Sequence, residues 1–374
     1  VIKILEKLGL KVVMQTADEL RLQVPAYRPD LEREIDLLEE VARIYGYDKI
    51  PAVPKITITL EKKYDESVFT EKIRDISTAL GFFEILNNPL IDEKSASFEG
   101  NPIKLLNPQS IDMAYLRTSL IPAGLSVIAN NINIGEKNLF FFEIGNVFSK
   151  ISLKEISSFE DFVEERRLLL IITGNEKEKE WNSSEKEVDF FSLKGLVDSF
   201  ITKFSLDNVL NDSYYHNGNR NFACYYTKSF ADRVIGKGGK VSKDVLKQYD
   251  INQDVYCFEF NLEELMEIHQ REKSYSSPIK YPKVLRDFAF ILDSSATYEE
   301  LLSFIKAESS NLLQDVRLFD LFESESLGQG KKSLAFSLGY QAADRTLTED
   351  EVEKEFLHLI KLIEKKFNAK LRGN

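Results

Sequence analysis

The sequence is poor in the residue types that build disulfides, zinc sites and histidine-dependent catalytic sites. It has two cysteines and three histidines among 374 residues. Two cysteines make neither a disulfide framework nor a zinc pattern, so we expect a reducing compartment, the cytoplasm. The histidines His216, His269 and His358 are scattered without paired spacing, which suggests neither a zinc site nor a catalytic triad.

Long apolar runs and a basic charge excess are also missing. No stretch approaches the roughly 20 apolar residues of a membrane helix, and no signal peptide precedes the first structured residues. We therefore expect no membrane association, and we expect the chain to be a fragment of a longer protein. The net charge of −12 argues against a generally basic coat for nucleic acid. Residues 275–374 carry 14 Lys and Arg against 16 Asp and Glu, so this segment is the best suited to approach a polyanion.

The glycine-rich stretch IGKGGKV, residues 235–241, approaches a phosphate-binding loop but lacks two of its residues. Val234 stands where the first glycine belongs, and Val241 stands where a Ser or Thr would bind magnesium. We predict a glycine-rich turn between strands instead. A nucleophile elbow is also missing, and the sequence offers no convincing catalytic constellation.

Six carboxylates in YRPDLEREIDLLEE, residues 27–40, raise the question of a metal site. They are Asp30, Glu32, Glu34, Asp36, Glu39 and Glu40. Apolar residues fall on one broad arc of a helix, namely Leu37, Leu38, Val41, Ile44 and Tyr45. Asp36, Glu39 and Glu40 fall on the opposite side. Asp30 is a candidate N-cap, and Glu39 and Arg43 have the spacing of a helical ion pair. The pattern alone favours an amphipathic helix with a solvated acidic side.

We predict a mixed α+β chain with three parts, residues 1–52, 60–272 and 278–374. The first part combines a helical start, a strand in DELRLQVP and the acidic helix, and the two prolines of YDKIPAVPKI predict a linker. Strand patterns such as NLFFFEIGNVF and RRLLLIITG dominate the second part, which predicts an antiparallel sheet with helices between some strands. The polar stretch HQREKSYSSPIKYP marks a boundary near residue 275.

The last part alternates strands and helices in a recognisable order. LRDFAFILD, DVRLFDLFE, KSLAFSLGYQ and a terminal KLR have strand patterns. Thr297 with Glu300 and Thr348 with Glu351 form capping boxes that open two helices. The order β-α-β-β-α-β predicts a ferredoxin-like unit, a sheet with helices on one face only.

The open face of that sheet is a candidate RNA surface. Its central strand places Ala335, Ser337 and Gly339 on one side and larger apolar residues on the other. Four cations flank this face: Lys283, Arg286, Lys331 and Lys332. A flat face of small residues beside cations can accept RNA loops through stacking and phosphate contacts. Ordinary surface cations beside a plain sheet are the alternative.

Several stretches together resemble the C-terminal half of the bacterial phenylalanyl-tRNA synthetase beta subunit, essentially from end to end. They are YRPDLEREIDLLEEVARIYGYDKIP, LRTSLIPAGLSVIANN with FFEIGNVF, and YPKVLRDFAFILD with RTLTEDEV and a terminal LR. The resemblance implies a B5 domain remnant, a class II synthetase-like antiparallel core and a ferredoxin-fold anticodon-binding domain. It also implies that Asp30, Asp36, Glu39 and Glu40 bind Mg²⁺, an ion that takes oxygen ligands. With tRNA as the implied ligand, five cations are candidate tRNA contacts by charge and position: Lys283, Arg286, Lys331, Lys332 and Arg345.

The same resemblance implies a core without catalytic residues of its own. The arginine-containing motifs of class II synthetases are missing between residues 67 and 270. The implied role is support of a catalytic alpha subunit that binds phenylalanine and ATP, in an assembly of two alpha and two beta subunits that charges the tRNA for phenylalanine. Two alternatives remain, a stand-alone RNA-binding module and an independent enzyme with an unrecognised site.

Overall fold

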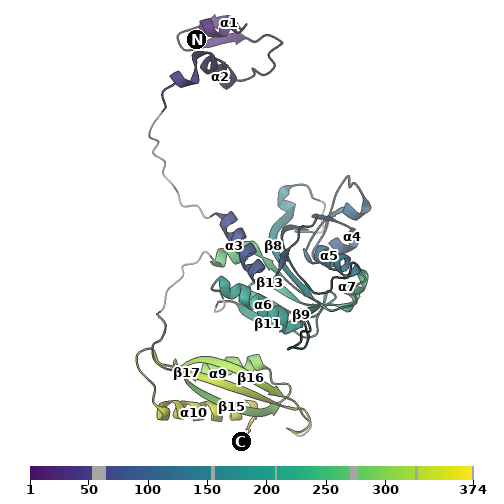
Figure 1. The fold of residues 1–374 in the computed structure, drawn as a ribbon, viewed down its shortest axis with the longest axis vertical. Coiled ribbons are helices and arrows are strands. Elements are labelled where there is room, and N and C mark those ends of the chain that lie inside the picture. Colours follow the sequence, from purple (N-terminus) through teal and green to yellow (C-terminus); the bar gives the residue numbers. More distant parts are fainter. Residues whose placement is uncertain (53–64, 153–155, 207–208, 270–276, 325–326, 373–374) are drawn as a thin grey trace. The chain divides into compact units, whose positions relative to one another are not determined.

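A computed structural model describes residues 1–52, 65–152, 156–206, 209–269, 277–324 and 327–372 (Figure 1). Contacts divide the chain into Val1–His269 and Gln270–Asn374. Residues 53–56 of the predicted linker YDKIPAVPKI and the predicted boundary near residue 275 lie outside the described residues. Within the described ranges, none of the helices has the length and apolar character needed to cross a membrane.

The N-terminal part is a small α/β body with a thin core. Its elements are α1 (Ile2–Lys7), β1 (Lys11–Gln15), β2 (Leu20–Gln23), α2 (Glu34–Tyr45) and the 3-10 turn η1 (Tyr47–Lys49). The two strands form an antiparallel hairpin. Among the described residues here, Leu5, Leu10 and Leu31 are the buried apolar side chains, and Leu37 and Val41 of α2 pack against them.

Helix α2 buries less of its predicted apolar arc than the periodicity indicates. Leu38, Ile44 and Tyr45 are exposed, so the prediction holds for Leu37 and Val41 only. The short hairpin and α1 cover only part of the apolar side of α2. One side of α2 therefore presents apolar side chains to its surroundings.

The middle part is built on a seven-stranded sheet with the order β11-β12-β13-β14-β8-β7-β3. In chain order the strands are β3 (Phe83–Glu84), β7 (Leu139–Lys150), β8 (Phe162–Thr173), β11 (Asn211–Tyr215), β12 (Phe222–Phe230), β13 (Arg233–Val241) and β14 (Val255–Asn261). Neighbouring strands are antiparallel except β3 and β7. The predicted antiparallel core is confirmed.

Helices cover both faces of this sheet (Figure 1). They are α3 (Glu66–Ala79), α5 (Ile121–Asn133), α6 (Phe190–Lys203), α7 (Lys243–Gln248) and α8 (Leu262–His269). Leu168, Leu170 and Ile172 of β8 belong to the core shared with α3, α6 and α8, whereas Leu169 and Ile171 belong to the core shared with α5 and α7. The unbroken apolar run of β8 is thus a strand buried on both sides.

Shorter elements lie around the sheet. They are β4 (Leu90–Ile91), α4 (Glu93–Ala96), β5 (Ile103–Lys104), η2 (Ile111–Met113), β6 (Tyr115–Leu116), η3 (Phe159–Asp161), β9 (Asn175–Lys177) and β10 (Lys186–Glu187). The strands β4, β6 and β5 form a three-stranded antiparallel sheet, and β9 and β10 form a hairpin.

The glycine-rich stretch predicted as a turn is instead the interior of strand β13. Its glycines allow neighbouring strands to approach closely. A Cβ atom on Gly238 would lie 2.1 Å from the carbonyl oxygen of Cys257, and one on Gly239 would lie 2.1 Å from that of Cys224. The turn prediction failed because glycine also serves where two backbones meet.

The C-terminal part has the predicted β-α-β-β-α-β order, so the ferredoxin-like prediction is confirmed. Its elements are β15 (Val284–Asp293), α9 (Tyr298–Glu308), β16 (Leu313–Phe322), β17 (Lys331–Tyr340), α10 (Glu349–Phe367) and β18 (Lys370–Leu371). The sheet order is β16-β17-β15-β18. Both capping boxes are formed. The helices and one sheet face enclose a core that includes Phe288, Phe290, Phe336 and Phe356.

A charge network joins the edge strand β11 to α6 and β12. Lys228 of β12 has a side chain that is 6% exposed and lies 2.7 Å from a carboxylate oxygen of Asp198 and 2.8 Å from one of Asp212. Lys194 of α6 contacts the same two carboxylates. Burial alone would raise the pKa of Asp212, but the hydrogen bond and charge of Lys228 outweigh burial, and the pKa is lowered. The network therefore holds β11 in the sheet.

Replacing Lys228 with Met tests the importance of this network. The change removes one of the two lysines that Asp198 and Asp212 share and leaves Lys194 beside them, and we expect the free energy of unfolding of the core to fall by about 2 kcal/mol in urea titrations. Because the pKa of Asp212 is lower in the folded chain, the stabilisation is present above about pH 4 and is lost as the pH falls through the folded value. Lys203→Met, an exposed change at the end of α6, is the control and should cost less than about 0.5 kcal/mol. Equal effects of the two substitutions would contradict this assignment.

Candidate functional site

One face of the C-terminal sheet is free of its helices and carries a lane of small residues. Ser333, Ala335 and Gly339 of β17 point away from the helices, because the alternate residues of β17 are in the core. Ala289 of β15 lies opposite Ala335 in the register. We call these four residues the lane. Ser333, Ala335 and Gly339 are nearly buried, so long side chains from the margins must cover the lane.

Arg372 and Phe322 meet across this lane. Arg372 follows β18 at one edge, where its backbone N–H donates to the carbonyl of Ala289. Phe322 belongs to β16 at the other edge and lies opposite Ser333. The guanidinium carbon of Arg372 is 5.4 Å from the centroid of the Phe322 ring, within the range of a cation–π contact. The lane is thus crossed by an arginine that ends on a partly exposed aromatic ring.

Sequence reasoning missed this pair, although a signal for it existed. The terminal LR was used for family resemblance, and DVRLFDLFE was treated only as a strand. A bulge between Leu318 and Asp320 changes the alternation of β16. That bulge places Phe322 opposite Ser333 and therefore on the open face. A regular alternation of side chains along β16 would instead have placed Phe322 on the helix side.

The predicted tRNA contacts are divided between the two faces of the sheet. Lys283 packs beside Gly339, and Lys331 pairs in register with Asp293, so both border the open face. Arg286 points to the helix side, where it contacts Glu349 and Glu353 of α10. Lys332 also points to the helix side, and its ammonium donates to the carbonyl of Ser294. Adjacent strand residues alternate in direction, so Lys331 and Lys332 cannot share one surface.

Arg345 lies at the start of α10 rather than on the sheet. Its guanidinium donates to Glu351 at 2.9 Å. The backbone N–H of Thr348 together with Arg345 lowers the pKa of Glu351 to about 2. Arg345 thus already has a carboxylate partner that is also the capping acid of the helix. Any phosphate contact by Arg345 would compete with this ion pair.

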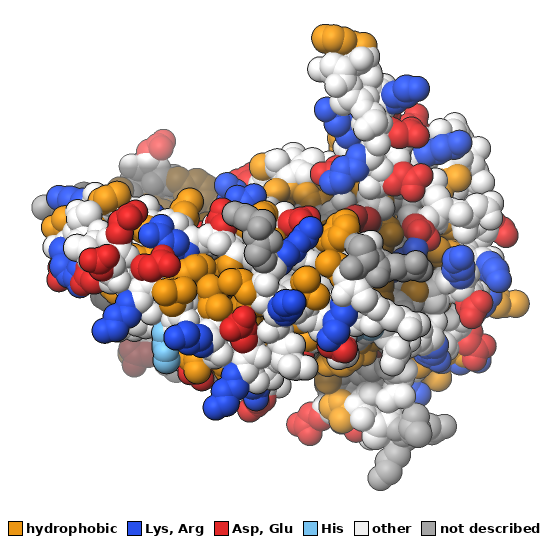
Figure 2. Space-filling view, turned by 90° about the horizontal axis from the view of Figure 1, so that it is seen from below, with side chains coloured by type: hydrophobic (Ala, Val, Ile, Leu, Met, Phe, Trp, Pro, Cys, Tyr) orange, Lys and Arg blue, Asp and Glu red, His pale blue; other side chains and the backbone are white. Residues whose placement is uncertain are grey.

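The open face carries nearly balanced charge. Its cations are Lys283, Arg317, Lys331, Lys370 and Arg372, and its acids are Asp287, Asp293, Asp315 and Asp320. Figure 2 shows one side of the structure as a whole, where blue and red side chains are mixed with orange ones. A ligand on the open face would be held by stacking and local contacts more than by a uniform positive potential.

Three of the four acids predicted to bind magnesium, Asp30, Asp36 and Glu40, have arginine partners in the structure, and Glu39 is exposed on α2. Arg28 lies 2.7 Å from both Asp30 and Glu40, and Arg43 lies 2.5 Å from Glu40. Asp30 is therefore not the N-cap of α2, and Arg43 pairs with Glu40 three residues away rather than with Glu39. These differences arise because Arg28 reaches back from the preceding turn and gathers the two acids.

Asp36 has a separate role at the start of α2. It accepts hydrogen bonds from the backbone N–H groups of Glu32 and Arg33 and forms an ion pair with the Arg33 side chain. These bonds lower the pKa of Asp36, and the arginine contacts lower the pKa of Asp30 and of Glu40. Among the residues that the structure describes, groups of three or more His, Cys, Asp or Glu placed to hold a metal ion are absent. In this arrangement the four acids do not fit a magnesium site.

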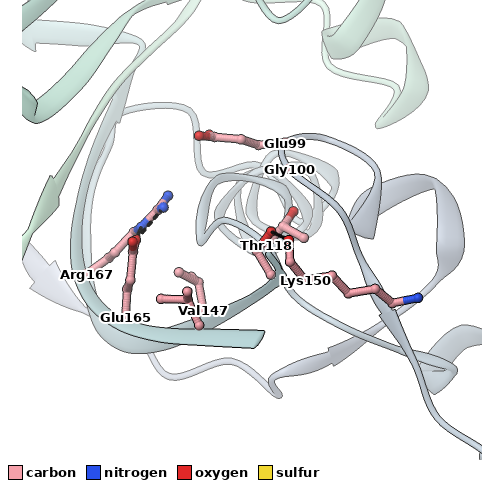
Figure 3. Close-up of a pocket in the computed structure, with 9 residues that line it drawn as sticks. Glu99, Gly100, Thr118, Val147, Lys150, Glu165 and Arg167 are labelled. Atoms are coloured by element: carbon pink, nitrogen blue, oxygen red, sulfur yellow. Dashed lines mark hydrogen bonds and ion pairs between the residues drawn. The ribbon is translucent and has the colours of Figure 1, made fainter. Parts of the chain in front are cut away.

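The middle part contains a cavity of about 240 Å³ between β7, β8 and the loop around Gly100 (Figure 3). Arg167 at its wall pairs with Glu165 and with the buried Glu259. Glu99 at its mouth pairs with Lys237. Burial raises the pKa of Glu259 despite the neighbouring arginine. The acids and the arginine of this cavity are engaged with other protein groups, and their contacts connect strands.

Two buried carboxylates hold the segment LRTSL, which carried part of the family resemblance. Glu143 accepts from Arg117 at 2.6 Å. Glu259 accepts from the backbone N–H of Leu120 at 2.6 Å and from the Ser119 hydroxyl at 3.2 Å. The segment therefore reaches its place at the start of α5 through hydrogen bonds to charged groups inside the core.

Comparison with known proteins assigns each part of the chain. Residues 50–262 match the family described as phenylalanyl tRNA synthetase beta chain CLM domain. Residues 279–372 match the ferredoxin-fold anticodon binding domain, and residues 1–47 match the tRNA synthetase B5 domain.

The phenylalanine–tRNA ligase beta subunit of Syntrophotalea carbinolica is 31% identical over 373 residues, which are 95% of this chain and 45% of that protein. That of Carboxydothermus hydrogenoformans is 32% identical over 385 residues, which cover 100% of this chain and 47% of that protein. A pyrrolysyl tRNA synthetase of Desulfitobacterium hafniense aligns with a TM-score of 0.43 and 14% identity over 57% of this chain and 71% of its own. That TM-score is too low to support an argument.

The chain spans about half the length of the curated relatives it matches. The family predicted from the sequence is confirmed by the match over residues 50–262 and by the relatives aligned along nearly the whole chain. The chain belongs to the family of phenylalanyl-tRNA synthetase beta chains.

Proposed function

We propose that this chain is a non-catalytic part of a cytoplasmic phenylalanine–tRNA ligase. Its three parts, residues 1–52, 60–272 and 278–374, act as separate modules. The core supports a catalytic alpha subunit that binds phenylalanine and ATP, in an assembly of two alpha and two beta subunits. The C-terminal part binds the anticodon end of the tRNA for phenylalanine. Family membership supports this role, and the open sheet face is the observation that carries the tRNA proposal.

The open face has the features that unpaired RNA requires. The lane provides a flat floor of small residues, and Phe322 provides an aromatic surface at its margin. Aromatic side chains stack on unpaired bases, and arginines contact both bases and phosphates. An unpaired base can therefore replace or join the guanidinium of Arg372 on the Phe322 ring. Lys283, Arg317 and Lys331 stand beside the lane as candidate phosphate contacts.

Phe322→Ala and Arg372→Gln test this surface in the full chain. We expect Phe322→Ala to weaken tRNA binding by about tenfold, because base stacking on an aromatic contributes about 1–3 kcal/mol, and to leave the salt dependence unchanged. Arg372→Gln should reduce the salt slope by about one. Leu357→Ala, an exposed change on α10, is the control and should bind as the parent does. Filter binding at several salt concentrations measures all of these values, and unchanged affinity for both test variants would reject the open face as the tRNA site.

The core has an exposed apolar edge suited to a protein partner. Phe83 of the edge strand β3 is 74% exposed, and Leu86 just after it is 82% exposed. Exposed apolar side chains at a short sheet edge are typical of an interface. The proposed occupant of this edge is the catalytic alpha subunit.

Size-exclusion chromatography with the alpha subunit tests the supporting role. We expect a co-eluting complex with the parent chain and its loss when Phe83 and Leu86 are both replaced by Asp, because charged groups would then be buried at the interface. Ile134→Asp, which is 79% exposed after α5, is the control and should leave the complex intact. Separate elution of the parent chain would count against the proposal itself.

Magnesium binding by Asp30, Asp36, Glu39 and Glu40 remains a proposal with a condition. Arg28 occupies Asp30 and Glu40, so the ion must compete with that guanidinium. Family resemblance supports the ligand set, whereas the observed ion pairs oppose it. Bound Mg²⁺ would supply a divalent charge that links the start of α2 to the preceding turn.

Arg28→Ala tests whether magnesium competes with arginine for this acidic cluster. If magnesium replaces the arginine, calorimetric titration with MgCl₂ should show affinity at least about threefold higher in Arg28→Ala than in the parent chain, because the competing cation is gone. Glu40→Gln should abolish binding, and Arg21→Ala, an exposed change on β2, should have no effect. Equal magnesium binding by the parent chain and Arg28→Ala would exclude competition at this site.

A further inference from the structure

The hairpin formed by β9 and β10 carries a single tryptophan at its tip. Glu180 and Ser183 exchange backbone hydrogen bonds, so Trp181 lies in the turn between them. Trp181 is 96% exposed and is the only tryptophan of the chain. An aromatic side chain of this size is usually buried to a large extent. The hairpin thus presents a large apolar side chain that its own domain does not cover.

The base of this hairpin is firmly attached to the core. Asn138 accepts from the backbone N–H of Asn175 and donates to Glu178, both at 2.8 Å. Glu176 pairs with Lys186 across the hairpin at 2.6 Å. Val188, directly after β10, is buried in the core. Trp181 is therefore held away from the sheet on an anchored support, which lowers the entropy that a partner must remove on binding.

The charge around Trp181 identifies the kind of partner. Residues 176–187 contain five glutamates and three lysines. This net negative charge disfavours an RNA backbone or an anionic lipid surface as the occupant. It favours a protein pocket that is apolar inside and has Lys or Arg at its rim. The indole N–H also requires an acceptor in that pocket.

A second copy of this chain offers a poor match within the part that the structure describes. The cavity of about 240 Å³ is lined mainly by polar and charged groups, among them Glu99, Glu165 and Arg167, and therefore suits an apolar indole ring poorly. A smaller cavity of about 80 Å³ beside Ser309 and Ser310 has too little room for an indole ring. The occupant is therefore a different protein chain.

The hairpin lies at the same end of the sheet as the apolar edge of β3. Phe83 pairs in register with Phe141 of β7, and two residues earlier Leu139 pairs with Thr173, just before the hairpin begins. One partner can thus reach both features. We propose that Trp181 inserts into an apolar pocket with a basic rim on the catalytic alpha subunit, which rests on the partnership proposed above.

Fluorine NMR on the full chain tests this docking directly. With one tryptophan, biosynthetic 5-fluorotryptophan gives a single resonance. We expect the resonance of the free chain to respond strongly to a dissolved paramagnetic agent, because the ring is exposed. Adding unlabelled alpha subunit should shift the resonance and remove that response. A complex that forms while the resonance stays unshifted and accessible would overturn the inference but not the partnership.

Binding measurements on variants provide the second readout. Trp181→Ala should raise the Kd for the alpha subunit at least about tenfold, as expected for a central aromatic anchor. Glu180→Lys with Glu185→Lys should slow association, because the basic rim would then face like charge. Leu106→Ala, 98% exposed in the same domain, is the control and should change the Kd by less than about twofold.

These outcomes separate the two proposals. If the parent chain forms no complex with the alpha subunit, both the partnership and the docking are refuted. Full affinity in Trp181→Ala would refute only the docking. A shift of the fluorine resonance caused by tRNA alone would also overturn the inference, because it would show that RNA occupies the hairpin.

Discussion

Two carboxylates buried in the core organise the middle part of the chain. Glu143 of β7 and Glu259 of β14 lie on either side of β8, both in register with Leu169, and both hold the segment from Arg117 to Leu120. A charge in such a place is tolerated only when hydrogen-bond donors surround it, since removing one partner of a buried pair costs about 3–5 kcal/mol. The segment is therefore constrained in position, and with it the start of α5 and the wall of the adjacent cavity. The packing of α5 against Leu169 and Ile171 of β8 depends on that placement.

The alternation of side chains along a strand explains how the two sheet faces of the C-terminal part differ. It sends Phe336 and Leu338 to the helices and leaves small residues on the free face. It also separates Lys331 from Lys332, so charge counted along the sequence does not translate into charge on one surface. What distinguishes the free face is a contact between its two edges, where Arg372 reaches Phe322. The two modules thus use one geometric rule with different results, a doubly buried strand in one and a sheet face without helices in the other.

Sequence reasoning succeeded where one local rule acted alone. The capping boxes at Thr297 and Thr348 and the apolar run of β8 follow from hydrogen bonding and periodicity, and all are present. It failed where three-dimensional contacts decided the outcome. The glycines of β13 serve contacts with strands far along the chain, and Asp30 is held by its near neighbour Arg28 instead of capping α2. Helical periodicity does not indicate that Arg28 joins Asp30 to Glu40, and it does not indicate the bulge that turns Phe322 outward. The tRNA contacts and the magnesium ligands stay predictions.

The thin core of the N-terminal part has a consequence for its motions. Three buried leucines close around α1 and the hairpin, and so small an apolar interior stabilises a body of this size only weakly. Such a region opens by local unfolding at a free energy far below that of the whole chain. Amide protons of α2 would exchange with solvent through these openings, whereas those of β8 would exchange only when the entire sheet unfolds. A partner bound to the exposed apolar side of α2 would slow that exchange. Slower exchange of the α2 amides would therefore show that this side of the helix is covered.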